Sequence, residues 1–386
     1  FEIKKRVGGG GVIKILFIIN NLSYFVSHRL SIAEASKKKG YDISIGYGEI
    51  GDINPNIIKN KGYKIYPLSM HRGGINFFQE INTIYSIWKL LKEVQPDILH
   101  LVTIKPYLYG GIVARLTKVP CVVSAIAGLG SLFIQNSFKN ILIRILLYPI
   151  FKFALGHKNQ SVIVQNNEDS KFLMDWGILD LKKTILIKGS GVNLNKFSIL
   201  DEPKGMPVIC FVGRLLKDKG VNEFVSAARI LNKRGVNVRF QLAGQKDFMN
   251  PSGLKAEEIK YIQEEGIVEV LGYQKDISIL FAKSHVICLP SYREGLPKVL
   301  QEAAAASRAI VTTDVPGCRQ SIIPNRSGLL VPVKDYKKLA DAIHWLIDHP
   351  AERIAMGKIG RQLAQKEFRV EKITQSHLAV YEKLIK

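Results

Sequence analysis

The sequence predicts an α/β protein with two doubly wound parallel sheets. Short apolar runs of strand length alternate with amphipathic stretches of helix length along almost the whole chain. The alternation lapses in a polar, Pro- and Gly-containing stretch at residues 198–205 and then starts again. With 386 residues, 47% of them hydrophobic, the chain is long and apolar enough for two cores. We therefore expect two domains, residues 12–200 and 206–370, and a final helix, 371–386, that crosses back to the first domain.

In the first domain, compact apolar runs predict buried strands, and 3.6-residue periodicity between them predicts helices. The strands are expected at 12–19, 41–46, 97–102 and 120–125, and the helices at 28–39, 76–94 and 107–117. Residues 1–11 hold a basic cluster and four glycines, which is typical of a flexible leader and not of a signal peptide.

The second domain repeats the pattern. Strands are expected at 207–212, 238–243, 268–271, 286–289 and 309–312, with helices at 221–233, after Pro297, and throughout the tail from about 339. Parallel sheets of this kind bind ligands at the carboxyl ends of their strands, so two of them facing each other would enclose a cleft.

The charge balance indicates an anionic partner. The formal net charge is +22, and the interval between Asp97 and Glu168 contains seven Lys and Arg residues but no acid. Nucleic acid, anionic lipid and diphosphate-bearing substrates all fit this sign. Nucleic acid is the least favoured, since no binding module or aromatic stacking platform accompanies the charge. The four cysteines lack CxxC spacing, which argues against a zinc site or a disulfide framework and suggests a reducing cytosol.

Residues 138–153 place cations among aliphatic and aromatic side chains. The stretch is interrupted and too short to cross a bilayer, so it predicts helices that lie in a membrane interface. The alternative is a core helix whose Lys and Arg side chains reach to the surface.

Two carboxylates, Glu294 and Glu302, lie eight residues apart across a predicted junction between a loop and a helix. Pro297 suits the first helical turn, which places Glu294 in the loop and Glu302 inside the helix. The positive end of a helix attracts phosphate, and carboxylates accept hydrogen bonds from sugar hydroxyls. The combination favours a nucleotide sugar as ligand.

The stretch Gly213-Arg214-Leu215-Leu216-Lys217-Asp218-Lys219-Gly220 follows the first strand of the second domain. Arg214 and Lys219 would point from a strand end toward the same place and could bind a diphosphate, while Gly213 would permit close backbone approach. The alternative for this stretch alone is a solvated basic turn.

Together these motifs resemble those of glycosyltransferase family 4, whose members have the GT-B fold of two facing Rossmann-like domains and transfer sugars from nucleotide sugars with retention and without metal. The resemblance implies that Glu294 binds hydroxyls of the donor sugar, that Glu302 binds the ribose, and that Arg214 and Lys219 bind the diphosphate, so that Glu294, Arg214 and Lys219 carry catalysis. Further contacts at the phosphates and sugar ring are implied for Gly295, Leu296, Pro297, Lys298 and Val299.

A narrower resemblance rests on residues 294–300 and on Thr313-Asp314-Val315-Pro316-Gly317-Cys318-Arg319. These are similar to bacterial enzymes that extend sugars on undecaprenyl diphosphate, several of which transfer N-acetylgalactosamine from UDP. The resemblance implies a peripheral enzyme at the cytoplasmic face of the inner membrane that acts in lipopolysaccharide, O-antigen or glycoprotein assembly.

In the first domain, Gly128 and Gly130 follow a strand where many family members carry a histidine, and the matching residue here is Ala127. The glycines could contact substrate or simply form a tight turn. His28 and Arg29 are candidates for an acceptor phosphate.

No nucleophile is evident, so front-face substitution is expected, with positioning and phosphate stabilisation supplying most of the catalysis. The lack of an Asp-x-Asp pair agrees with a reaction that needs no cofactor or metal. Two alternatives stay open: a UDP-sugar epimerase of the same architecture, and a basic nucleic-acid-binding protein.

Overall fold

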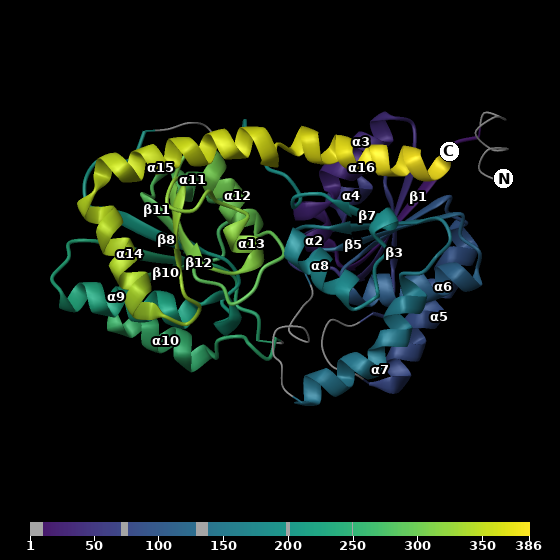
Figure 1. Cartoon of the computed structure of the whole chain (residues 1–386), viewed down its shortest axis with the longest axis horizontal. Coiled ribbons are helices and arrows are strands. Elements are labelled where there is room, and N and C mark those ends of the chain that lie inside the picture. Colours follow the sequence, from purple (N-terminus) through teal and green to yellow (C-terminus); the bar gives the residue numbers. More distant parts are fainter. Residues whose placement is uncertain (1–10, 71–75, 129–137, 198–200, 249) are drawn as a thin grey trace. The chain divides into compact units, whose positions relative to one another are not determined.

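The computed structural model describes residues 11–70, 76–128, 138–197, 201–248 and 250–386. The chain forms two compact units, one of Phe1–Ser190 with Glu371–Lys386 and the other of Gly191–Val370. Each unit is a parallel sheet covered by helices on both faces (Figure 1).

The sheet of the first unit has seven strands in the order β3-β2-β1-β4-β5-β6-β7. The sequence predicted β1 (Lys14–Asn21), β2 (Asp42–Glu49), β4 (Ile98–Val102) and β5 (Cys121–Ile126), and missed β3 (Lys64–Pro67), β6 (Gln160–Val164) and β7 (Thr184–Leu186). Strand order reverses between β1 and β4, which pair in register from Ile15 with Ile98.

Alternate residues of β1 enter two different cores. Leu16 and Ile18 face a core shared with α5 (Phe77–Val94), η1 (Pro106–Gly110), α6 (Gly111–Leu116), α7 (Phe138–Ala154) and α8 (Asn167–Asp175). Ile15 and Phe17 face a core shared with α2 (Leu22–His28), α3 (Leu30–Lys38), α4 (Asn56–Lys59) and α16 (Val370–Ile385). Helices α5 and α7 therefore cover the same face of the sheet.

The C-terminal helix α16 is part of the first unit. The Nδ1 of buried His100 on β4 lies 2.5 Å from the hydroxyl of Tyr381, and the amide of Asn159 donates to the carbonyl of Leu384 at 3.0 Å. Burial lowers the pKa of His100, which stacks on Phe17, so this histidine is a core residue.

The second unit has a six-stranded parallel sheet in the order β10-β9-β8-β11-β12-β13. The strands are β8 (Val208–Val212), β9 (Arg239–Ala243), β10 (Val268–Gly272), β11 (Val286–Leu289), β12 (Ala309–Thr313) and β13 (Gly328–Val331), of which only β13 was not predicted. The helices are α9 (Val221–Lys233), α10 (Ala256–Glu265), α11 (Ile277–Ala282), α12 (Lys298–Ala305), α13 (Pro316–Arg319), α14 (Tyr336–Asp348) and α15 (Pro350–Leu363), with the short 3₁₀ helix η4 (Lys217–Lys219) and the π-helix η5 (Ala364–Phe368).

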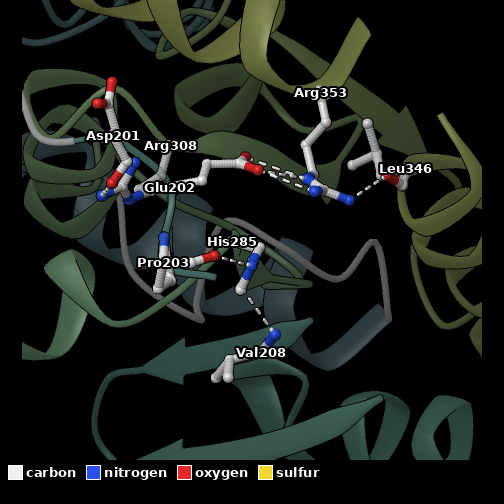
Figure 2. A network of polar contacts seen from close by, with 8 residues as sticks. All are labelled: Asp201, Glu202, Pro203, Val208, His285, Arg308, Leu346 and Arg353. Atoms are coloured by element: carbon white, nitrogen blue, oxygen red, sulfur yellow. Dashed lines mark hydrogen bonds and ion pairs between the residues drawn. The ribbon is translucent and has the colours of Figure 1, made fainter. Parts of the chain in front are cut away.

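The boundary between the units lies about ten residues earlier than the sequence suggested. Val192 already belongs to the second unit, because its N–H donates to the carbonyl of Phe368 at 2.7 Å. The predicted linker is also tied to this unit: Figure 2 shows the Glu202 carboxylate in contact with the guanidinium of Arg353, at 2.8 Å, and the carbonyl of Pro203 beside His285.

Two predicted helices are divided. The helix expected at 28–39 is replaced by α2 and α3, which meet at Arg29, and the tail is interrupted at His349 and again at Arg369. Among the helices that the structure describes, none combines the length and the apolar character needed to cross a bilayer.

Candidate active site

The predicted site residues of the second unit gather at its topological switch point. Strands β8 and β11 are neighbours in the sheet. From β8 the chain continues to β9 on one side, and from β11 it continues to β12 on the other side, so the loops after β8 and β11 lead toward opposite edges of the sheet. In open α/β sheets this is the place where ligands bind. The loop after β8 carries Arg214 and Lys219, and the loop after β11 carries Glu294.

Glu294 is held by two partners from these loops. The Lys219 ammonium forms an ion pair with its Oε1, and the hydroxyl of Ser291 donates to the same oxygen at 2.6 Å. The Glu294 side chain is 10% exposed and that of Lys219 23%. Both partners hold Oε1, so the carboxylate is fixed by one oxygen and can present the other to a sugar hydroxyl.

The loop that carries Glu294 is itself anchored. Ser291 is fully buried, and its carbonyl accepts a hydrogen bond from the hydroxyl of Thr313 at the end of β12. The N–H of Tyr292 donates to the carbonyl of Asp218 at 2.9 Å, and the Tyr292 hydroxyl donates to Glu223 on α9 at 2.7 Å. Three neighbouring elements therefore fix the position of the loop.

Glu302 lies inside α12, as predicted, and is 9% exposed. Burial raises the pKa of its carboxyl, and Lys298, whose Nζ lies 3.7 Å from Oε1, opposes this effect only in part. A carboxylate that is costly to ionise gains from additional hydrogen-bond donors, which a pair of ribose hydroxyls would supply.

Arg214 forms an ion pair that the sequence did not predict. Its guanidinium lies 2.8 Å from Asp247, in the loop that follows β9. The carbonyl of Gln245 in the same loop accepts from the N–H of Leu215 at 2.9 Å. Asp247 could have been found from its position just after a predicted strand beside β8.

The start of α12 differs by one residue from the prediction. Pro297 precedes the helix, with an extended ψ of 123°, and supplies no side-chain cap. Leu296 is buried in the core of the unit, so only its backbone is available to a ligand, whereas Lys298 and Val299 are half-buried. The helix start therefore offers backbone N–H groups and a Lys side chain at one place.

Glycines bring the loops of the site together. A Cβ on Gly317 would lie 2.4 Å from the carbonyl oxygen of Gly295 and 2.5 Å from that of Glu294. A Cβ on Gly244 would lie 1.7 Å from the carbonyl oxygen of Gly213. A Cβ on Gly213 would come no nearer than 3.4 Å to any other atom, so this glycine is not closely packed within the protein. That its backbone approaches a ligand closely remains a prediction.

Among the residues that the structure describes, the candidates in the first unit do not form a comparable cluster. Gly128 has a φ of 137°, which requires glycine and fits the tight-turn alternative, and Gly130 lies outside the described residues. His28 is at the end of α2, where it stacks on Tyr24 and lies 2.7 Å from the hydroxyl of Ser27.

Arg29, the other candidate for an acceptor phosphate, does not lie at the surface of the unit. Arg29 is 1% exposed, because the break between α2 and α3 turns it into the unit, where burial lowers its pKa. It donates to the carbonyl of His28 at 3.1 Å.

Helix α7 exposes an apolar face. Six of its side chains are between 39% and 65% exposed: Ile141, Leu142, Ile145, Leu146, Ile150 and Phe153. Of its predicted surface cations, Arg144 is buried, Lys152 lies over the ring of Tyr148, and the side chain of Lys139 lies outside the described residues. The face therefore exposes more hydrocarbon and less charge than the sequence suggested.

Two family models match the chain in succession. Residues 14–166 match the model described as "Glycosyl transferase 4-like", and residues 193–363 match "Glycosyl transferases group 1". The chain is thus a glycosyltransferase of the GT-B class. Within that class it belongs to the family 4-like enzymes, as the motifs around Glu294 and Glu302 predicted.

The chain is 29% identical, over 85% of its length and 88% of the relative's, to the N,N'-diacetylbacillosaminyl-diphospho-undecaprenol alpha-1,3-N-acetylgalactosaminyltransferase of Campylobacter jejuni. It is 26% identical, over 70% of its length and 71% of the relative's, to the UDP-Gal:alpha-D-GlcNAc-diphosphoundecaprenol alpha-1,3-galactosyltransferase of Escherichia coli.

Solved structures show the same fold. The sucrose-phosphate synthase of Thermosynechococcus elongatus superposes with a TM-score of 0.79 at 22% identity and covers 96% of this chain and 99% of that one. Anabaena Alr3699/HepE, in complex with UDP and glucose, superposes with a TM-score of 0.77 at 16% identity and with the same coverage of the two chains.

Proposed function

We propose that this enzyme transfers an N-acetylhexosamine, with N-acetylgalactosamine as the first candidate, from a UDP-sugar to a hydroxyl of a saccharide linked to polyprenyl diphosphate. The observation that carries the proposal is the Lys219–Glu294–Ser291 contact at the switch point, with Glu302 on the adjoining helix. The names of the Campylobacter and Escherichia relatives, which both specify an undecaprenol diphosphate acceptor, support the acceptor class.

In this proposal Glu294 binds the sugar, Glu302 the ribose, and Arg214, Lys219, Lys298 and the start of α12 the diphosphate. The acceptor oxygen attacks the anomeric carbon on the face from which UDP departs, the bond from that carbon to the phosphate oxygen breaks, and the acceptor proton passes to a phosphate oxygen. Retention follows, and the products are the extended glycan and UDP.

Cations and helix N–H groups supply the charge stabilisation, so we expect the rate to be unchanged by EDTA. Each charge-assisted hydrogen bond to the diphosphate contributes about 1.5 to 3 kcal/mol, and more as charge develops on the leaving group.

We further propose that the enzyme is peripheral to the cytoplasmic face of an anionic inner membrane, since its acceptor is lipid-linked. The exposed apolar face of α7 supports this proposal. The helix would lie in the headgroup region and not across the bilayer.

The test is a panel of UDP-sugars incubated with an undecaprenyl-diphosphate-linked monosaccharide, with the lipid product analysed by mass spectrometry and NMR. We expect one added N-acetylhexosamine with the anomeric configuration of the donor. Failure of every UDP-sugar to extend the acceptor would refute the proposal. A control without acceptor, followed by NMR, tests the epimerase alternative: quantitative conversion of the UDP-sugar to its epimer would favour that enzyme instead.

A further inference from the structure

Helix α5 (Phe77–Val94) carries an apolar face that points away from the protein. Its members are between 42% and 81% exposed: Phe77, Phe78, Ile81, Tyr85 and Trp88. At 100° per residue these five side chains fall within an arc of about 100°. We call this arc the aromatic face of α5.

The aromatic face is not needed to pack the helix. The buried residues of α5 lie on its opposite side: Thr83, Ile87, Leu90, Leu91 and Val94. Four of them enter the core between the helices and the sheet. An amphipathic helix normally turns polar side chains outward, so an aromatic outer face indicates a second contact that the described residues of the unit do not themselves provide.

The charges within the aromatic face and nearest to its edge have one sign. Lys89 and Lys92 are exposed, and the helical geometry places them within or beside the arc. Glu80 and Glu93 each fall about 60° beyond an edge of the arc, on opposite sides of it, and Glu80 pairs with Lys105 at 2.6 Å. Exposed Trp and Tyr side chains with flanking Lys are typical of a helix in the interface of an anionic bilayer.

The aromatic face also has a neighbour of the same kind. Helix α7 covers the same face of the sheet as α5, and both pack against η1 and α6. Two helices on one side of the unit thus expose apolar side chains.

We propose that the aromatic face of α5 inserts into the headgroup region of an anionic membrane and forms one docking surface with α7. This rests on the proposed function only for its biological setting, because membrane binding can be measured without donor or acceptor. The occupant is a lipid bilayer, since the face combines apolar rings with cations and no acid.

The direct test uses the fluorescence of Trp88 in the full chain carrying Trp176→Phe and Trp345→Phe. The probe is a vesicle of phosphatidylglycerol and phosphatidylethanolamine with brominated acyl chains. We expect a blue shift and quenching by bromines near the carbonyl end of the chains. The matched control keeps Trp345 alone, which is 38% exposed in the second unit, and should be neither shifted nor quenched. An unquenched Trp88 on vesicles that bind the protein would overturn the proposal.

A second test compares Phe77→Ser/Phe78→Ser with Tyr261→Ser/Tyr273→Ser, whose side chains are 62% and 63% exposed in the second unit. In vesicle flotation we expect the first variant to bind about tenfold more weakly and the control to bind like the unchanged protein. The first variant should keep full transfer to a water-soluble acceptor analogue, which separates docking from catalysis. Unchanged vesicle binding by the first variant would refute the proposal. The proposal would also be refuted if the unchanged protein and the control variant formed a dimer that the first variant could not form, while the first variant still bound vesicles normally.

Discussion

Glu302→Gln distinguishes a carboxylate that holds the donor from one that takes part in proton transfer. Gln has nearly the same shape but cannot ionise, so it loses the charge-assisted part of any hydrogen bond from a ribose hydroxyl. A hydrogen bond to a charged acceptor contributes about 1.5 to 3 kcal/mol and one to a neutral acceptor about 0.5 to 1.5 kcal/mol, so the loss is about 1 to 1.5 kcal/mol for each bond. At about 1.4 kcal/mol for each factor of ten, the affinity for UDP should fall by about 5- to 12-fold for each bond.

Isothermal titration with UDP measures this loss, and initial rates show where it acts. The ribose is remote from the bond that breaks, so we expect KM for the UDP-sugar to rise while kcat stays within about twofold. Glu264→Gln, on the exposed side of α10, is the matched control because its side chain is 64% exposed. Unchanged UDP affinity, or a fall in kcat with KM unchanged, would refute the role assigned to Glu302.

The same substitution makes a prediction for stability. Burial raises the pKa of the Glu302 carboxyl above its ordinary value of 4.5. The folded protein therefore holds this proton more tightly than the unfolded chain does, which stabilises the fold below pH 4.5; this contribution is lost as the pH rises through the folded-state pKa. Gln cannot ionise, so the variant should unfold at higher denaturant concentration than the unchanged protein at pH 7, and the difference should shrink toward pH 4.5. An equal difference at both pH values would contradict the raised pKa.

Three further substitutions test the surroundings of the site. Ser291→Ala removes a hydrogen bond to Glu294 and should lower kcat by about tenfold with little change in UDP affinity, so a wild-type kcat would show that the hydroxyl does not position the carboxylate. Gly317→Ala forces the loop at Glu294 to move and should abolish most transfer, whereas Gly360→Ala, with no atom nearer than 3.5 Å, should be active; equal rates for the two would argue against the close packing. Arg353→Met removes the ion-pair partner of the Glu202 carboxylate, whose side chain is 10% exposed, and should destabilise the second unit by about 3 to 5 kcal/mol in urea unfolding. A change below about 1 kcal/mol would contradict this.

Most of the fold could be predicted from the sequence because central strands of parallel sheets are continuous apolar runs. Two of the strands that were missed, Lys64–Pro67 and Thr184–Leu186, are three or four residues long, lie at sheet edges and carry little apolar signal. The break at Arg29 could not be predicted either, since it depends on how the side chain is accommodated inside the unit.

The candidate site was predicted in part for a similar reason. Glu294 and Glu302 are set by a local junction of loop and helix, which the sequence shows directly. The partners of Arg214 and Glu294 depend instead on contacts between segments far apart in the chain, such as Asp247 with Arg214 across 33 residues and Lys219 with Glu294 across 75. Only the folded sheet brings these side chains together.

The measurement that tests the central claim most directly is the single-turnover transfer of sugar from UDP-N-acetylgalactosamine, or from the UDP-sugar that the panel identifies, by the unchanged enzyme and by Glu294→Gln, with UDP affinity measured in parallel. If Glu294 binds the donor sugar in the transition state, the transfer rate falls by about 100-fold or more while the affinity for UDP is retained. A variant that transfers at the unchanged rate, or that loses UDP binding to the same degree as transfer, would contradict the assignment.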